Sequence, residues 1–202
     1  MSELKSKCRR LENKVVLVTG GTQGAYHCVP FVPGIGLAIA ERMGLEGATV
    51  VICSRREKNV KQAADLLAKQ GIAVHGLTCH VGNTEDRVKL IKAIVEKCGR
   101  IDVLVSNVAA NPVMGGMLDV TTEDVWVGLI ATDFQDKIFG LNVKSHFFLT
   151  REAAPHMPAG TFFLLMVEGS SIIFISSYAG YQASPLLGAY SVSKTALIGL
   201  TK

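Results

Sequence analysis

Several features that mark other classes of protein are missing from this sequence of 202 residues. Its five cysteines form no Cys-x-x-Cys pair, and its five histidines lack i,i+4 or His-x-x-Glu spacing, so we predict no metal site. The odd cysteine count and the lack of a signal-peptide pattern favour a reduced, intracellular protein. The longest apolar runs, FFLLMV and IIFI, are separated at Glu168 and fall far short of the ~18 apolar residues of a membrane span. We therefore expect no membrane span.

The excess of basic over acidic residues is also small. The net charge is +4, and the first fourteen residues hold five basic side chains against two acidic ones. Most of the excess therefore lies on a short N-terminal arm, which we interpret as solvated, although some basic arms bind polyanions. Because nucleic-acid binding needs basic residues clustered on a folded face, we expect no nucleic-acid partner.

What the sequence does contain predicts a packed globular domain. Hydrophobic types make up 49% of the residues and charged types 19%, a balance that excludes extensive disorder. Short β-branched runs predict strands over residues 14–19, 49–53, 73–78, 101–105 and 171–176, and helical periodicity covers 35–45, 57–69 and 84–98. This alternation predicts one α/β domain over residues 1–202, with a doubly wound, Rossmann-like parallel sheet.

A glycine-rich turn, TGGTQG, follows the first predicted strand. Gly20 and Gly24 lie in this turn, and Gly36 lies at the start of the next predicted helix. Such a turn brings backbone N–H groups and a helix N-terminus against a pyrophosphate, although glycines also simply make turns. The position after the first strand favours a dinucleotide site.

Ser54, Arg55 and Arg56 follow the second predicted strand. A site that prefers NAD carries an acidic residue here, whereas arginine accommodates the 2′-phosphate of NADP through charge-assisted hydrogen bonds. A solvated loop is the alternative interpretation. With the glycine turn nearby, these residues favour NADP as the cofactor.

Ser177, Tyr190 and Lys194 form the most specific pattern in the chain. Tyr190 and Lys194 are four residues apart, and hence lie on one face of a helix. A Tyr-x-x-x-Lys motif alone arises readily by chance. The serine thirteen residues before the tyrosine, just after a predicted strand, makes coincidence a poor explanation.

With these motifs the sequence resembles the short-chain dehydrogenase/reductase family, from about residue 8 to its last residue. The glycines match the phosphate-binding motif, and Ser106-Asn107-Val108-Ala109 stands where the family has Asn-Asn-Ala-Gly. Asn142, in LNVKS, matches the helix asparagine of the catalytic tetrad. The stretches VSNVAANP, NVKSHFFLT and YSVSKTALIGLTK are similar to the peroxisomal NADP-dependent carbonyl reductase/retinol dehydrogenase branch.

This resemblance implies an NADPH-dependent enzyme that transfers hydride between the cofactor and a carbonyl compound or alcohol, of ketone, α-dicarbonyl or retinal type. Tyr190 would donate the proton, Lys194 would lower the tyrosine pKa and hold the nicotinamide ribose, and Ser177 would bind the carbonyl oxygen. Asn142 would hold a water for proton relay, and Asn107 would line the adenosine side. The family resemblance also implies a homo-oligomer in its full-length form, in the cytoplasm or the peroxisome.

Three segments depart from the family pattern, at residues 25–34, 127–135 and 158–168. The first leaves open whether Gly24 or Gly34 fills the third glycine position. The second would carry Asn142 to the wrong side of an unbroken helix, so we expect the helix to restart at the capping box Thr132-x-x-Gln135. The segments are either natural loops or products of unusual splicing.

The chain also stops eight residues beyond Lys194, where family members continue with further strands. We therefore expect the C-terminal strands to be missing, which would leave the apolar fifth strand as an uncovered edge. A chain of this kind would be marginally stable or aggregated unless a full-length partner covers it. The alternative to an active reductase is accordingly an inactive, truncated isoform that associates with full-length subunits.

Overall fold

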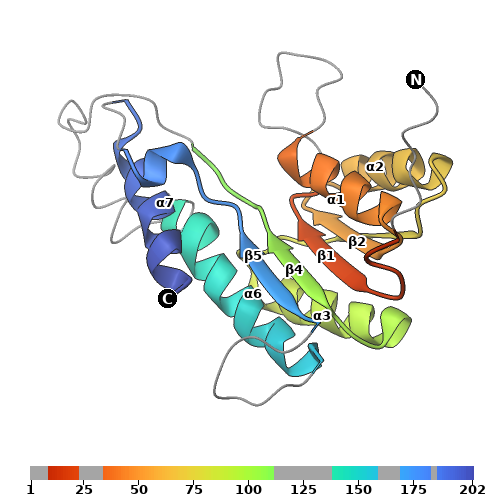
Figure 1. Cartoon of the computed structure of the whole chain (residues 1–202). Helices are drawn as coiled ribbons and strands as arrows, with labels where there is room; N and C mark the ends of the chain where they lie inside the picture. Colours follow the sequence, from red (N-terminus) through yellow and green to blue (C-terminus); the bar gives the residue numbers. More distant parts are fainter. Residues whose placement is uncertain (1–8, 23–33, 112–137, 159–168, 183–185) are drawn as a thin grey trace.

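A five-stranded parallel sheet forms the centre of the protein in the computed structural model, which describes residues 9–22, 34–111, 138–158, 169–182 and 186–202 (Figure 1). The strand order is β3-β2-β1-β4-β5, and every neighbouring pair is parallel. The strands are β1 (Val15–Thr19), β2 (Thr49–Ser54), β3 (Val74–Thr78), β4 (Val103–Ser106) and β5 (Ser171–Phe174). The order reverses direction between β1 and β4, which is the doubly wound arrangement that the sequence predicts.

Helices cover both faces of this sheet, with α1 and α2 on one side and α3 and α6 on the other (Figure 1). The α-helices are α1 (Ile35–Leu45), α2 (Glu57–Lys69), α3 (Thr84–Cys98), α6 (Ser145–Ala153) and α7 (Gly188–Leu200). A π-helical turn, η1 (Gly140–Lys144), leads directly into α6, and short 3₁₀ turns form η2 (Ala154–His156) and η3 (Tyr178–Gly180). Among the helices in the described part of the chain, none is both long and apolar enough to cross a membrane.

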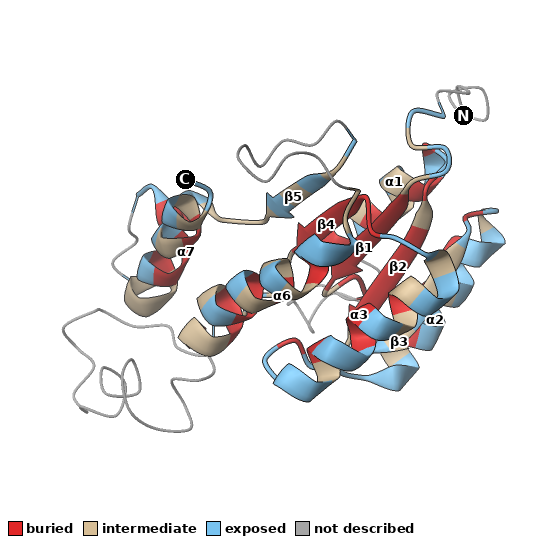
Figure 2. Ribbon diagram, turned by 90° about the horizontal axis from the view of Figure 1, so that it is seen from below, coloured by how far each residue is buried: buried red, intermediate tan, exposed pale blue. Residues whose placement is uncertain are grey.

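Strand side chains alternate between two apolar cores, and the central strands are buried on both faces (Figure 2). Leu17 of β1 packs toward α3 and α6, whereas Val16 and Val18 pack toward α1 and α2. This alternation follows from the two-residue period of a strand. It explains why β1, β2 and β4 read as continuous apolar runs, since both of their faces need apolar side chains.

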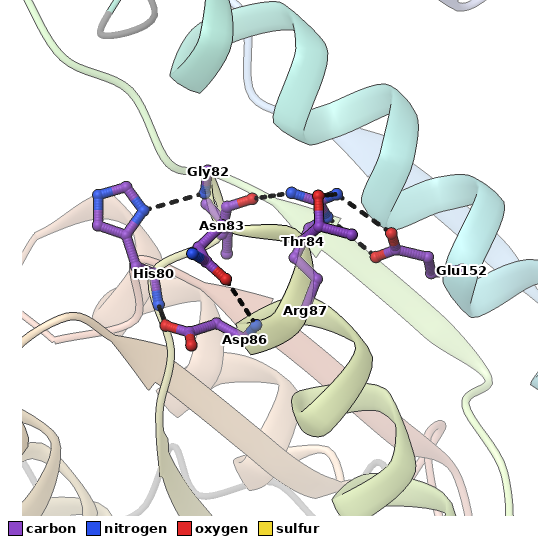
Figure 3. Close-up of polar contacts among 8 residues, drawn as sticks. His80, Gly82, Asn83, Thr84, Asp86, Arg87 and Glu152 are labelled. Carbon is purple, nitrogen blue, oxygen red and sulfur yellow. Dashed lines mark hydrogen bonds and ion pairs between the residues drawn. The ribbon is translucent and has the colours of Figure 1, made fainter. Parts of the chain in front are cut away.

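A buried ion pair joins α3 to α6 (Figure 3). Arg87 Nε donates to Glu152 Oε2 at 2.9 Å, and the other guanidinium nitrogens donate to Val81 O at 2.8 Å and Thr84 Oγ1 at 3.1 Å. The guanidinium also lies 5.4 Å from the centroid of the Phe148 ring. Because each guanidinium nitrogen of Arg87 has a partner, α6 is held at a fixed position on the sheet.

The predicted elements are all present, with small differences at their ends. The fourth strand begins at Val103 rather than Ile101. At this end of the sheet the N–H of Val15 donates to the Asp102 carboxylate, at 2.9 Å, instead of to a main-chain carbonyl of the neighbouring strand. The fifth strand ends at Phe174 rather than Ser176, because the next carbonyl, of Ile175, accepts a hydrogen bond from Lys194. The departures at 25–34, 127–135 and 158–168 lie outside the described residues, apart from Gly34 and Pro158.

The two faces of β5 differ in their exposure, and this difference generates a prediction. Ile172 packs against the core formed with α3 and α6, whereas Ile173 is 37% exposed on the opposite face. We expect Ile173→Lys to change the unfolding free energy by less than about 0.5 kcal/mol and to reduce self-association of the chain. Ile172→Lys, the matched control, should cost more than about 2 kcal/mol because it buries a charge.

Chemical denaturation and size-exclusion chromatography of the two variants measure these effects. Equal destabilisation by the two lysines would show that β5 is covered on both faces and would contradict the assignment.

Candidate active site

The candidate site begins where β1 and β4 end side by side, at the point where the strand order reverses. Asn107, just beyond β4, donates from its main chain to Thr19 Oγ1 at 3.1 Å. Its side-chain Nδ2 donates to the carbonyls of Thr19 at 3.1 Å and Gly20 at 3.3 Å. Gly20 has a φ of 63°, a left-handed conformation that favours glycine and turns the chain out of β1. Parallel α/β sheets bind ligands in the crevice at this reversal.

Gly36 brings the start of α1 against this turn. A Cβ atom at Gly36 would lie 2.5 Å from the Gly20 carbonyl oxygen and 2.6 Å from Asn107 Nδ2. No side chain fits there, so glycine is required for the helix N-terminus to approach the ends of β1 and β4. The α1 cap is Gly34, and Gly24 lies outside the described residues.

The three residues predicted to select the cofactor lie at the end of β2, beside β1. Ser54 is the last residue of the strand and is half-buried. Arg55 and Arg56 are exposed, and Arg56 caps the start of α2. The two arginines thus lie at the same edge of the sheet as Gly20 and one strand away from it.

Asn142 lies in the π-helical turn η1 and is fully buried. Its Oδ1 accepts from the N–H of Ala110 at 2.8 Å, and its Nδ2 donates to the carbonyl of Ala110 at 2.9 Å and to Ser193 Oγ at 3.1 Å. The side chain therefore joins η1 to the segment after β4 and to α7. Both Nδ2 hydrogens are used, so the water expected at Asn142 would have to bind an oxygen of this residue.

Tyr190 and Lys194 share one face of α7, as their spacing predicts. The Lys194 side chain is only 1% exposed, and its Nζ lies 5.8 Å from the centroid of the Tyr190 ring. Nζ donates to the carbonyl of Ile175, just after β5, at 2.7 Å. Burial lowers the pKa of Lys194 to about 8, because removal from water penalises the ammonium form.

Ser177 is positioned by the packing of η3 against α7. Its Oγ accepts from the N–H of Ala179 at 3.2 Å and caps η3. Ser176 Oγ donates to the carbonyl of Lys194 at 2.9 Å, and Thr195 Oγ1 donates to the carbonyl of Gly180 at 2.8 Å. These bonds on both sides of Ser177 hold it next to the helix that carries Tyr190 and Lys194.

His146 fixes a second point of the segment after β4. Its Nε2 lies 2.9 Å from the Val108 carbonyl, and since a carbonyl accepts, the imidazole donates from this nitrogen. The ring packs edge-on against Phe174, with centroids 5.7 Å apart. Burial lowers the pKa of His146 to about 4, so the imidazole is neutral at physiological pH. His146 therefore acts as a fixed donor rather than a proton carrier.

The structure thus joins the elements that carry Asn142, Ser177, Tyr190 and Lys194: Asn142 binds α7 through Ser193, and the segment from Ile175 to Gly180 binds α7 through Ser176, Lys194 and Thr195. The two arginines lie farther along the same edge of the sheet. Within the described residues, no three His, Cys, Asp or Glu side chains group as metal ligands.

A family model described as short chain dehydrogenase matches residues 14–202. The chain belongs to this family. Tropinone reductase-like 3 of Erythroxylum coca is 47% identical over 194 residues, covering 96% of this chain and 64% of the relative. Human dehydrogenase/reductase SDR family member 4 is 42% identical over 192 residues, covering 95% of this chain and 59% of the relative. The chain therefore spans about three-fifths of the length of these curated relatives.

Solved structures of the short-chain dehydrogenase family share the fold. A Mycobacterium smegmatis member superposes with a TM-score of 0.74 at 30% identity, over 95% of this chain and 69% of that one. A Burkholderia phymatum member in complex with NAD has a TM-score of 0.74 at 26% identity, over 95% of this chain and 58% of that one. A point variant of actinorhodin polyketide ketoreductase with NADPH has a TM-score of 0.71 at 29% identity, over 93% of this chain and 62% of that one. The family resemblance and the Rossmann-like fold predicted from the sequence are confirmed.

Four residues that hold this site were not found by sequence analysis. Ser193 binds Asn142, and His146 binds the Val108 carbonyl. Thr19 accepts from the main chain of Asn107, and the main chain of Ala110 binds Asn142, so both help to fix the segment after β4. Ser193 directly precedes Lys194, and this adjacency was the only signal in the sequence. The Ala110 contacts are made by main-chain atoms, which carry no residue-type signal.

The buried Lys194 predicts a specific dependence of stability on pH. Between pH 8 and 10.5 the unfolded chain holds a proton on this lysine that the folded chain has lost, so stability must rise with pH in this window. The unfolding free energy of the wild-type chain should therefore rise relative to Lys194→Met by up to about 3 kcal/mol from pH 7 to 10.5.

Urea denaturation of both proteins at a series of pH values measures this difference, and the shared titrations of other groups cancel. A difference that stays flat across the window would mean that the lysine is not desolvated.

Proposed function

We propose that this protein is an NADPH-dependent oxidoreductase that transfers hydride between a nicotinamide cofactor and a carbonyl compound or alcohol. The observation that carries the proposal is that Tyr190 and the buried Lys194 share one face of α7, with Lys194 Nζ 5.8 Å from the Tyr190 ring centroid and bound to the Ile175 carbonyl. Asn142 is joined to the same helix through Ser193. Ser177 is held against the same helix. Membership of the short-chain dehydrogenase family supports this assignment.

In this proposal, Tyr190 donates a proton to the carbonyl oxygen of the substrate during reduction. The neighbouring Lys194 ammonium favours the phenolate and lowers the energy needed to give up that proton. Ser177 stabilises the oxygen through a hydrogen bond as negative charge develops on it. NADPH, when bound, supplies the hydride.

The residues present fit such a cofactor. Gly20 and Gly36 let the N-terminus of α1 approach the end of β1, where a pyrophosphate would be held by backbone N–H groups and the helix dipole. Arg55 and Arg56 at the end of β2 would bind the 2′-phosphate of NADP. Related structures hold either NAD or NADPH, so the preference rests on these arginines.

The substrate class comes from the resemblance and from the names of relatives. Tropinone reductase-like and ketoreductase names describe those proteins, and they support a ketone, α-dicarbonyl or retinal substrate for this one. A homo-oligomer of a longer chain, in the cytoplasm or the peroxisome, belongs to the same proposal. An inactive isoform that associates with full-length subunits is the alternative, and the next experiment separates the two.

Cofactor binding is measured by titrating the purified chain with NADPH and with NADH and following nicotinamide fluorescence. We expect saturable binding with enhanced emission for NADPH. Replacing Arg55 and Arg56 together by Ala should weaken the binding of NADPH by about ten- to a hundredfold, because a charge-assisted pair is lost. The binding of NADH should weaken much less. Lys58 and Lys61 of α2, which are also basic, offer a charge-matched control as a double Ala variant.

Equal losses for NADPH and NADH would contradict the 2′-phosphate assignment. No saturable binding of either cofactor by the wild-type chain would favour the inactive isoform.

Catalysis is tested with Tyr190→Phe, which removes only the hydroxyl and keeps the packing of the ring. We expect NADPH-dependent reduction of a carbonyl substrate to be abolished and the Kd for NADPH to change by less than about twofold. Tyr178→Phe, a change to an exposed tyrosine of η3, is the matched control. A Tyr190→Phe variant that kept more than about a tenth of the rate would exclude the proton-donor role.

A further inference from the structure

Ser193 lies between the catalytic tyrosine and lysine on α7 and is fully buried. Its Oγ donates to the carbonyl of Tyr190 at 2.7 Å and accepts from Asn142 Nδ2 at 3.1 Å. The hydroxyl therefore uses its hydrogen on one proposed catalytic residue and its oxygen on another. No other side chain among the described residues joins these two directly.

Asn142, the partner of Ser193, also binds the segment after β4. Asn142 binds both the N–H and the carbonyl of Ala110, at 2.8 and 2.9 Å. A continuous run of hydrogen bonds thus leads from Ala110 through Asn142 and Ser193 to the main chain at Tyr190. It joins three parts of the fold: the segment that follows β4, the turn η1 and the helix α7.

A helical serine that binds the carbonyl three residues earlier is common and by itself means little. Two observations separate Ser193 from that ordinary case. Its oxygen also accepts from a buried side chain of another element. Ser191, on the same helix and equally buried, has an Oγ without a hydrogen-bond partner within the described structure. Burial of a serine on α7 therefore does not require this contact, and Ser193 has a specific one.

The opposite side of α7 is held independently. Ser176 and Thr195 bind it to the end of β5 and to η3, which follows Ser177. Gly180 packs so closely there that a Cβ atom would lie 2.9 Å from the Lys194 carbonyl carbon. Loss of the Ser193 hydroxyl would thus leave the Ser177 side intact and free only the side that faces Asn142.

We propose that Ser193 is a positioning residue, which sets Tyr190 relative to Asn142 and the segment after β4. This inference rests on the proposed function, since it assigns Ser193 a part in the same reaction. The hydroxyl touches neither substrate nor cofactor in this role. It acts by fixing the distance between the proton donor on α7 and the crevice beside β4, to which rates of proton and hydride transfer are sensitive.

The test compares Ser193→Thr with Ser193→Val, which have the same shape and differ only by the hydroxyl. We expect kcat of the Val variant to fall about ten- to a hundredfold with the Kd for NADPH within about threefold, and kcat of the Thr variant to stay within about threefold of wild type. Ser191→Ala is the control for loss of a buried hydroxyl on α7 and should leave kcat unchanged.

A second readout is independent of activity. Amide hydrogen exchange of the peptide that contains Ala110 should be faster in Ser193→Val than in wild type, and unchanged in Ser193→Thr and Ser191→Ala. Ser193→Ala provides the same comparison if the Val variant does not fold, as judged by circular dichroism.

Each outcome decides the inference. Equal kcat and equal exchange in the Thr and Val variants would overturn it, as would a Val variant that loses NADPH binding and kcat together. If the wild-type chain neither binds NADPH nor turns over, the proposed function fails. In that case exchange at Ala110 still decides whether Ser193 fixes this segment.

Discussion

The arrangement of this site depends on the burial of one lysine. A buried ammonium group is stable only where other groups compensate for lost water, and Lys194 finds the Ile175 carbonyl at 2.7 Å. That bond uses the first carbonyl beyond β5, so it ends the strand and binds the sheet to α7. The pKa of Lys194, lowered to about 8, shows that this bond compensates only in part for the loss of water around the ammonium group. A buried lysine that joins a strand end to a helix beside a tyrosine is consistent with the catalytic role proposed for Lys194.

The other half of the site, at the ends of β1 and β4, depends on close backbone approach. Gly36 allows α1 to contact the Gly20 carbonyl, and Asn107 binds the ends of β1 and β4 together. Arg87 and Glu152 hold α6, and therefore η1 and Asn142, on the opposite face. The ends of β1 and β4 and the helix α7 are thus fixed by separate contacts, which are connected through Asn142 and its bonds to Ala110 and Ser193.

The sequence predicts most of the fold because the central strands are apolar on both faces and the helices have clear periodicity. It also predicts Tyr190 and Lys194 as neighbours, since helical spacing alone determines this. It does not predict that Lys194 binds the Ile175 carbonyl or that Asn142 binds Ala110, because main-chain partners leave no trace in residue type. Ser193 is missed for a related reason: a serine within a helix usually makes only a local bond.

The central claim is that Lys194, the proposed catalytic lysine, is buried and bound to the Ile175 carbonyl just beyond β5. The most direct measurement is a pH titration by NMR of the chain labelled with ¹³C at the lysine ε carbons, with the Lys194 signal assigned from its loss in Lys194→Met. The account predicts a titration midpoint near 8 for this lysine. A midpoint near 10.5, like that of an exposed lysine, would contradict it.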